Sequence, residues 1–324
     1  MSKKKQTRYS GIGGQAVLEG VMMKNNDKYA VAVRKTNGEI DVKIEDYKGI
    51  GGEKKLSKLP FIRGVFSFID SLVLGMKVTM HSASFFEEEE EQPSKAEQRL
   101  SKILGNKADD IMMGFTVVLS VIIAVALFML LPFFISDFLG RFIRNASLIA
   151  IVEGIVRIMI FIGYILAISF MKDIKRLFMY HGAEHKCINC IEKGRPLTVR
   201  DVKRSSRLHK RCGTSFLLFV VLVSVIVFFF IRVDNMVLKL VIRLALVPVI
   251  AGISYELIRL AGKSDNVIVN ILSKPGLLMQ KLTTKEPDEE MIEVAIASVE
   301  AVFDWKAYLK ENFGYDVDET WEDD

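Results

Sequence analysis

The chain contains an uncharged apolar run, IMMGFTVVLSVIIAVALFMLLPFFI, at Ile111–Ile135, which is 25 residues long. A helix needs about 20 consecutive apolar residues to cross the hydrocarbon core of a bilayer, so this run predicts a membrane-spanning helix. Half of the 324 residues are hydrophobic and the mean hydropathy is +0.28. Such a chain is too apolar for an ordinary soluble domain or a disordered segment. The 3 cysteines are too few for a secreted disulfide framework and favour a reducing compartment.

Three further apolar segments predict an α-helical integral membrane protein with four transmembrane helices, at residues 111–135, 146–171, 213–231 and 236–261. The fourth segment is the weakest, because charged side chains break it near both ends. The second contains Glu153 and Arg157, which stand four positions apart and share one helix face. They predict a structural ion pair, with a polar path through the membrane as the alternative.

The charge distribution predicts the orientation of the spans. The loop at residues 172–212 contains 12 Lys or Arg and 4 Asp or Glu. The positive-inside rule therefore predicts that this basic loop is cytoplasmic. With four spans, both termini then lie on the same cytoplasmic side. The basic start MSKKKQTRYS has no apolar run behind it, so we expect no secretory signal peptide.

Residues 1–110 and 262–324 are expected to be cytoplasmic. Residues 1–58 contain the alternating stretches QAVLEGVMM, KYAVAVRK and EIDVKIED with the turn signal Asn37-Gly38, which is typical of a small β-meander. Residues 59–83 carry charges at seven-residue intervals and predict an amphipathic helix lying on the membrane surface. Residues 84–110 read as an acidic linker and a helix. Residues 262–324 contain a further amphipathic helix and an acidic tail.

The C-terminal tail opposes the charge of the rest of the chain. Residues 286–324 hold 14 acidic and 2 basic residues, whereas the preceding part has a net charge of about +17. Besides the lipid bilayer, the expected partner is therefore a protein that contacts the basic loop and the acidic tail. The sequence predicts no specific nucleic-acid partner and does not determine an oligomeric state.

Three of the 4 histidines and all 3 cysteines lie between His181 and Cys212. His181 and His185 stand four apart, so on a helix both imidazoles project from one face toward one cation. With Glu184 they form the pattern H-x-x-E-H, in which two histidines hold zinc and the glutamate deprotonates water. The site therefore predicts a divalent metal, zinc, with Glu184 as the general base.

A third ligand is required, and His209, Cys212 and Glu192 are the three candidates. An alternative is a structural zinc on the set Cys187, Cys190, His209 and Cys212, which would leave the histidine pair unused. A second alternative is a basic rim that binds lipid headgroups without a metal.

Five stretches and one single residue resemble the YqhQ-like family of bacterial inner-membrane proteins, which are described as predicted metal-dependent enzymes. They are GGQAVLEGVMM (Gly13–Met23), YHGAEHK (Tyr180–Lys186), Glu192, LHKRCGTSF (Leu208–Phe216), YELIRLA (Tyr255–Ala261) and PGLLMQKLTTKEPD (Pro275–Asp288). The resemblance covers nearly the whole chain and implies a location in the bacterial cytoplasmic membrane.

The resemblance also implies which residues belong to the family pattern: His181, Glu184, His185, Glu192, His209 and Cys212. Cys187 and Cys190 look like departures from it, which argues against the structural zinc, and Lys210 is a further departure that touches no ligand. The resemblance singles out Gln15 and Glu19, which would share one strand face. We hypothesise that this face covers the histidine cluster with Glu19 as a ligand or base. The alternative is a meander that packs under the interfacial helix.

Two functions are therefore compared. The first is a metal-dependent hydrolase acting on a peptide or on a lipid-linked ester or phosphate. The second is a non-catalytic membrane scaffold or assembly factor that docks a protein complex, such as insertion or translation-coupled machinery. A transporter is disfavoured because no inverted repeat is evident.

Overall fold

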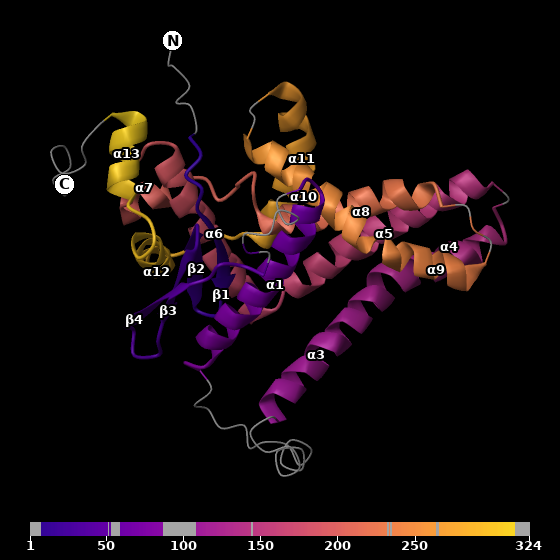
Figure 1. Cartoon of the computed structure of the whole chain (residues 1–324), viewed down its shortest axis with the longest axis horizontal. Coiled ribbons are helices and arrows are strands. Elements are labelled where there is room, and N and C mark those ends of the chain that lie inside the picture. The colour runs from indigo at the N-terminus through magenta and orange to yellow at the C-terminus, as the bar shows by residue number, and fades with distance from the viewer. Residues whose placement is uncertain are drawn as a thin grey trace. The chain divides into compact units, whose positions relative to one another are not determined.

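A computed structural model of the chain describes residues 8–50, 52, 59–86, 108–143, 145–231, 233, 235–263 and 266–314. The chain divides into two compact units. Their helices and strands are labelled in Figure 1. Unit 1 comprises Met1–Phe86, Ile165–Val220 and Leu244–Asp324, and unit 2 comprises Glu87–Tyr164 and Val221–Arg243. Most of the acidic linker predicted at 84–110, the first residues of the basic start and the end of the acidic tail lie outside the described residues.

Unit 1 begins with a small antiparallel sheet, which confirms the predicted meander. Its four strands pair in chain order: β1 (Gly13–Val17), β2 (Gly20–Asn25), β3 (Lys28–Arg34) and β4 (Ile40–Asp46). The stretch QAVLEGVMM forms two strands, because the chain reverses between Val17 and Gly20, which are paired. Glu19 adopts a positive φ of 47° in this turn. Since the turn positions hold neither Gly, Asn nor Pro, the sequence does not signal the reversal.

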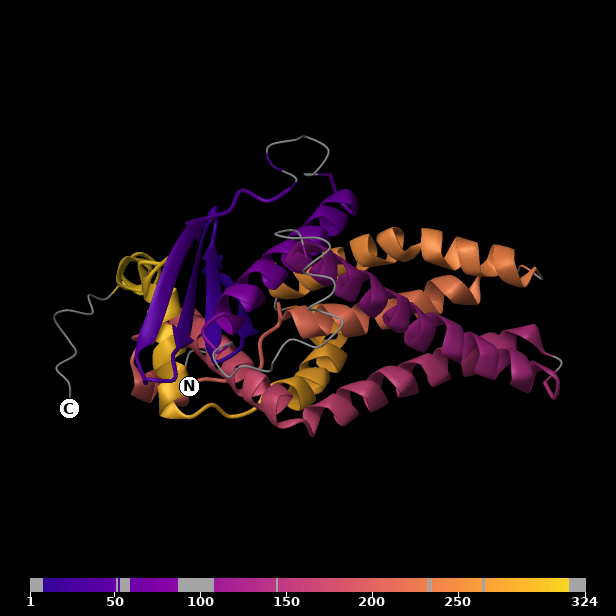
Figure 2. The ribbon, with the colours of Figure 1, turned by 90° about the horizontal axis from the view of Figure 1, so that it is seen from below.

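Successive side chains of each strand point to opposite faces of the sheet. Both faces carry apolar side chains, and both are covered by helices. One face packs against α1 (Ile62–Ala83) and the other against α6 (Lys172–Glu192) and α12 (Glu289–Glu300). Figure 2 shows the indigo sheet between the purple helix α1 and the yellow helix α12. The first face contributes Val17, Met22, Tyr29, Val31 and Val33, and the second contributes Val21, Met23 and Ala32.

The hypothesis that Gln15 and Glu19 cover the histidine cluster is wrong. The Gln15 side chain lies against Gly75 of α1, where an added Cβ would come 2.7 Å from its Oε1. Glu19 lies beyond the strand and forms an ion pair with Arg176 at 2.5 Å. The face with Gln15 therefore packs under α1, as the alternative stated, and the opposite face turns toward α6.

Much of the predicted basic loop at 172–212 is helical. Helix α6 spans Lys172–Glu192 and the short helix α7 spans Val199–Lys203, with Thr198 capping its first turn. The C-terminal half of α6 is buried in the core of unit 1, where Ile188 and Ile191 are at most 1% exposed. This packing makes the helix that carries the H-x-x-E-H motif a central element of unit 1.

The described residues contain two helices that are long and apolar enough to cross a membrane. One is the continuous helix Gly114–Gly140, built from α3 (Ala108–Val125), the π-helical turn η3 (Ala126–Leu130) and α4 (Leu131–Gly140). The other is α5 (Ala146–Ser169). These helices agree with membrane association, whereas the count of four spans stays a prediction.

The remaining two predicted spans are shorter or interrupted. Helix α8 (Gly213–Phe229) has 17 residues. Helices α9 (Met236–Ala245) and α10 (Val247–Lys263) are bent by 40° at Leu246 and give a third span only if the pair crosses as one. Pro248 follows the bend and lacks the N–H that a continuous helix would donate toward Leu244.

The C-terminal helices of unit 1 are bounded by polar caps. Helix α11 (Val267–Thr283) begins after Asn266, whose side chain accepts a hydrogen bond from the Ile268 N–H. Helices α12 and α13 (Trp305–Phe313) begin after Asp288 and Asp304 in the same way. The end of α11 matters most, because it brings a glutamine and a threonine to the candidate site.

Candidate metal centre

Helix α6 presents its two histidines side by side. The ring centroids of His181 and His185 are 4.4 Å apart, as expected for residues one turn apart on a helix. The His185 side chain is buried, with the residue 1% exposed, whereas His181 retains partial access to solvent. Both imidazoles therefore lie at the inner edge of a polar recess.

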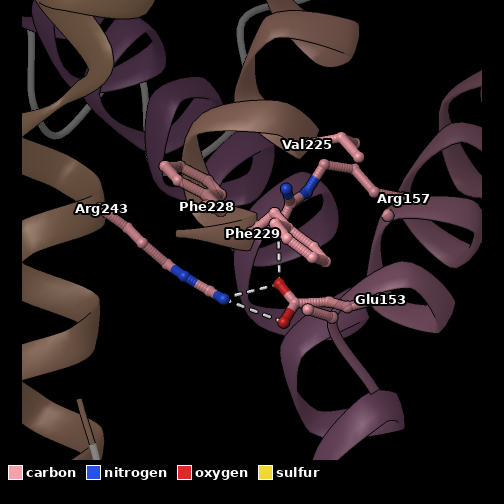
Figure 3. A pocket seen from close by; sticks show the side chains of 8 residues that line it. Glu153, Arg157, Val225, Phe228, Phe229 and Arg243 are labelled. Atoms are coloured by element: carbon pink, nitrogen blue, oxygen red, sulfur yellow. Dashed lines mark hydrogen bonds and ion pairs between the residues drawn. The ribbon is translucent and has the colours of Figure 1, made fainter. Parts of the chain in front are cut away.

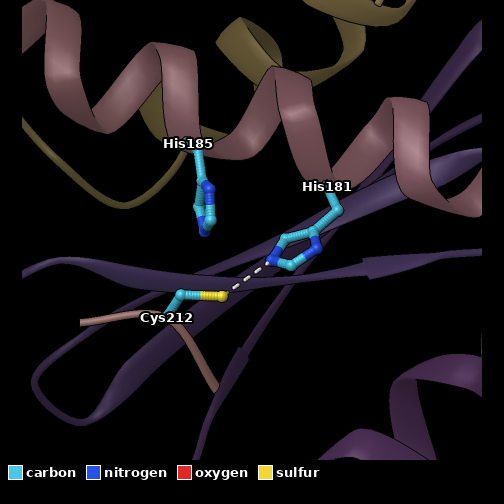
Figure 4. Close-up of side chains that lie close together, drawn as sticks. All are labelled: His181, His185 and Cys212. Carbon is cyan, nitrogen blue, oxygen red and sulfur yellow. Dashed lines mark hydrogen bonds between the residues drawn. The ribbon is translucent and has the colours of Figure 1, made fainter. Parts of the chain in front are cut away.

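Cys212 joins the two histidines from a distant part of the chain (Figure 4). It directly precedes α8, and its Sγ lies 3.2 Å from His181 Nε2. One ligand atom each from His181, His185 and Cys212 lie within 4.8 Å of one another. Two imidazole nitrogens and one thiolate match the donors that zinc prefers, and a three-ligand set leaves its fourth position open.

Backbone carbonyls determine which nitrogen of each histidine is free. His181 Nδ1 lies 2.9 Å from the Thr283 carbonyl oxygen, and His185 Nδ1 lies 2.6 Å from that of Arg207. Because a carbonyl oxygen can only accept, each Nδ1 carries the proton and donates it. Each Nε2 then faces the cluster, and a cation that binds there displaces the proton that His181 Nε2 shares with Cys212 Sγ. Histidines that bind metals are oriented in this manner.

The Cys212 sulfur has further polar contacts. The Thr214 N–H donates to its Sγ at 3.4 Å, and the Thr214 hydroxyl lies 2.9 Å away. Burial alone would raise the pKa of this thiol, but the charges of His181 and His185 outweigh burial and hold the pKa well below its usual value. For His181, burial acts to lower the pKa, and Cys212 outweighs it and raises the pKa to about 9. The thiol is thus stabilised as the thiolate that metals bind.

Glu184 lies next to this group without joining it. Its Oε2 is 3.8 Å from His181 Nε2, and the residue is 5% exposed. Burial raises the pKa of Glu184, against the effect of His185 and His181 and of a hydrogen bond from the Gly14 N–H. A carboxylate with a raised pKa beside two imidazoles is suited to accept a proton near neutral pH.

Sequence reasoning missed the role of Gly14 in β1. A Cβ at this position would lie 2.8 Å from Glu184 Cγ and 2.7 Å from the Met22 carbonyl oxygen, so only glycine permits the close approach of β1 to α6. The run GIGG that begins at Gly11 is the signal that could have indicated it. At Gly14, the backbone of β1 thus lies directly against Glu184 of α6, with no side chain between them.

The other two candidate ligands form a neighbouring network. Glu192 accepts hydrogen bonds from Ser10 N at 2.9 Å and from Arg211 Nη2 at 2.5 Å, and its Oε2 lies 3.5 Å from His209 Nε2. Burial would raise the pKa of Glu192, but His209, Arg211 and Ser10 lower it to about 2. Burial lowers the pKa of His209. Glu192 is therefore engaged by an arginine rather than by the His181 group.

The alternative of a structural zinc on Cys187, Cys190, His209 and Cys212 has no counterpart among the described residues, where His181, His185 and Cys212 are the residues that come together. Cys187 and Cys190 point into the hydrophobic core, and burial raises the pKa of both thiols. Cys190 Sγ donates to the Pro196 carbonyl at 3.2 Å. These two cysteines therefore pack as small apolar residues.

A cavity of about 250 Å³ opens onto the site. The residues that line it include His181, Glu184, His185, His209, Arg211 and Cys212, together with Tyr9 and residues 11–14. The Tyr9 ring lies against the Arg211 guanidinium, with 4.1 Å between Cζ and the ring centroid. The three residues that could hold a metal and Glu184 thus line the same cavity.

Comparison with known proteins indicates relatives for nearly the whole chain. Residues 59–305 match the family model described as "Protein of unknown function (DUF1385)". The chain is 37% identical to "Uncharacterized protein YqhQ" of Bacillus subtilis over 304 residues, which cover 93% of this chain and 94% of the relative. No solved structure matches the chain.

Proposed function

Since the chain belongs to the DUF1385 family, whose description names no activity, we propose its function from the site alone. It is a multi-pass protein of the bacterial cytoplasmic membrane that binds one zinc ion on His181, His185 and Cys212. The observation that carries this proposal is the pair of Nδ1 contacts to backbone carbonyls, at 2.9 and 2.6 Å. They direct both Nε2 atoms toward Cys212 Sγ, so that one cation could replace the proton between His181 and the thiolate.

The membrane topology belongs to the same proposal. Four spans with both termini cytoplasmic put α6 and the sheet on one side of the membrane, with α1 on its surface. The long apolar helices and the 12 basic residues of 172–212 support this orientation. Exposed apolar residues on α1, among them Leu72 at 54%, support its contact with lipid.

The proposed reaction is hydrolysis of a peptide or of a lipid-linked ester or phosphate. Zinc bound in such a site lowers the pKa of water and polarises a carbonyl or phosphoryl oxygen. Glu184 accepts the proton of the attacking water and returns it to the leaving group, for which its raised pKa is suited. The Gly14 N–H and the packing of β1 hold the Glu184 carboxylate in place. Glu192, which also lies beside His209, holds the Arg211 guanidinium at the cavity.

The test is the zinc content of protein purified without a histidine tag, measured by plasma mass spectrometry. We expect about one zinc per chain for the wild type, and loss of zinc in the double variant His181→Ala, His185→Ala. His81→Ala is the matched control, because His81 lies on α1 and contacts Phe85 instead. Glu184→Gln should keep its zinc and lose hydrolysis.

Two results would overturn the proposal. One is a wild-type protein that binds no zinc even after zinc is added, and the other is equal zinc in the double variant. In either case the scaffold function is tested instead, by crosslinking the full chain and a chain truncated after Lys285. A partner lost on truncation would support docking through the acidic tail.

The 3.2 Å contact between Cys212 Sγ and His181 Nε2 also favours a second function. A thiolate beside an imidazole that is oriented by a carbonyl, here that of Thr283, is the arrangement of a cysteine nucleophile. Cys212→His separates the two functions, since histidine can replace thiolate as a zinc ligand but not as a nucleophile. Zinc binding with residual hydrolysis supports the metal enzyme, and zinc binding without hydrolysis supports the nucleophile.

A further inference from the structure

Unit 2 contains a buried charge cluster that is independent of the metal centre (Figure 3). Glu153 of α5 receives Arg157 Nη2 at 2.7 Å from its own helix, which confirms the ion pair expected from their spacing. Arg243 of α9 adds two parallel bonds to the same carboxylate, at 2.7 and 2.9 Å. The Glu153 side chain is 7% exposed and the two arginine side chains are each 4% exposed.

The cluster has one more positive than negative charge. Among the residues that the structure describes, neither arginine forms an ion pair with a carboxylate other than Glu153. A buried charge without a counter-charge carries a penalty of several kcal/mol. The excess positive charge therefore requires a partner.

Neutral groups complete only part of the shell around the arginines. Arg157 Nε donates to the Phe128 carbonyl in the π-helical turn at 3.2 Å, and its Nη1 lies 3.4 Å from Ser224 Oγ. Phe228 lies 4.8 Å from the Arg157 Cζ and 5.0 Å from that of Arg243. Within the described part of the chain, the buried Nε of Arg243 has no hydrogen-bond partner.

A small cavity lies at this cluster. Its volume is about 10 Å³, and Glu153, Arg157 and Arg243 line it together with apolar residues such as Val225 and Phe229. A volume of this size accommodates one water-sized ligand. A phosphate or carboxylate group is too large for it, and a water molecule would leave the excess charge uncompensated.

We propose that the Glu153–Arg157–Arg243 cluster binds one small monovalent anion, of the size of chloride. The anion balances the positive charge of the second arginine, and both arginines line the cavity that would hold it. It stabilises the packing of α5, α8 and α9, because all three helices supply residues to the cavity.

The test compares chloride with gluconate, a monovalent anion too bulky for the cavity, at constant ionic strength. The full chain in detergent should show a saturable rise in melting temperature with chloride, of about 5 °C at saturation, and none with gluconate. Equilibrium dialysis with radiolabelled chloride should give about one bound ion per chain, displaced by bromide.

Variants connect the effect to the cluster. Arg243→Gln makes the cluster neutral and should abolish the chloride response. If that variant does not fold, Glu153→Gln raises the charge to two positives and should lower the chloride concentration at half-saturation. Lys239→Gln is the matched control, because it removes one positive charge from the same helix outside the cluster. An identical response to chloride and gluconate, or no bound chloride in the wild type, would overturn the proposal.

Discussion

Gln280 is expected to stabilise the candidate site through its hydrogen bonds to His209 and Ser215, and the variant Gln280→Ala tests this. The side chain is fully buried on α11. Its Oε1 accepts from His209 N–H at 2.8 Å, and its Nε2 donates to the His209 carbonyl and to Ser215 Oγ, each at 2.7 Å. One amide thus satisfies both backbone groups of His209 and the start of α8.

The magnitude follows from the groups left without partners. Gln280→Ala leaves the N–H and the carbonyl of His209 buried and unpaired, and each such group costs about 1–3 kcal/mol. The free energy of unfolding should therefore fall by about 4 kcal/mol, which corresponds to a drop in melting temperature of about 6 °C for a chain of this length. Since the loosened segment leads to Cys212, the affinity for zinc should fall about 10- to 100-fold.

The assay is thermal unfolding in detergent together with zinc titration against a chelating dye. Gln280→Glu keeps an acceptor for the His209 N–H but sets a buried carboxylate oxygen against the His209 carbonyl oxygen, so it should destabilise the fold at least as much as alanine. Ser273→Ala is the control on the same helix, because the Ser273 hydroxyl donates only to the Val269 carbonyl of its own helix. A melting temperature for Gln280→Ala equal to that of Ser273→Ala would refute the reasoning.

Three further perturbations are expected to act through single contacts. The pKa of Glu192 is lowered to about 2 from an unfolded value near 4.5. The ionised carboxylate therefore contributes about 3 kcal/mol to stability above about pH 4.5, and this contribution is lost as the pH falls toward 2. In melting experiments at a series of pH values, the stability of the wild type should drop more steeply than that of Glu192→Gln. Gly182→Ala places a Cβ 2.1 Å from a main-chain carbonyl oxygen and should destabilise the fold by about 2 kcal/mol or more. Gly163→Ala is the control, because a Cβ there meets no atom within 4 Å. Equal melting temperatures for the two variants would contradict this prediction. Gly14→Ala should displace Glu184 and lower both stability and hydrolysis while zinc remains bound. Gly13→Ala has no atom within 4 Å of the added Cβ and should leave stability and hydrolysis unchanged. Similar losses in the two variants would argue against a specific role for Gly14.

Local patterns in the sequence predicted the parts of the fold that depend on neighbours along the chain. The side chains of the apolar run at 111–135 are stable only when they are removed from water, in contact with lipid or with other apolar groups. The alternation before residue 46 predicted the meander. The pair Glu153 and Arg157 and the pair His181 and His185 were predictable because helical residues four apart share a face.

Contacts between distant segments were not predictable in this way. The turn at Leu18–Glu19 separates β1 from β2 without a turn residue, and the register that follows directs Gln15 toward α1 rather than toward the histidines. The approach of Gly14 to Glu184 depends on how the sheet packs on α6. Arg243 lies 90 positions from Glu153 in the chain, and only the packing of α9 brings the two together.

The candidate site shows the same division. Residue types and spacing predicted a divalent metal on the histidine pair, with a structural zinc or a lipid-binding rim as alternatives, and left His209, Cys212 and Glu192 as equal third candidates. The fold distinguishes them, because the turn before α8 brings Cys212 to His181 while Arg211 and Ser10 engage Glu192. Spacing along a helix is a property of the local backbone, whereas the distance between two segments is determined by the side chains that pack between them.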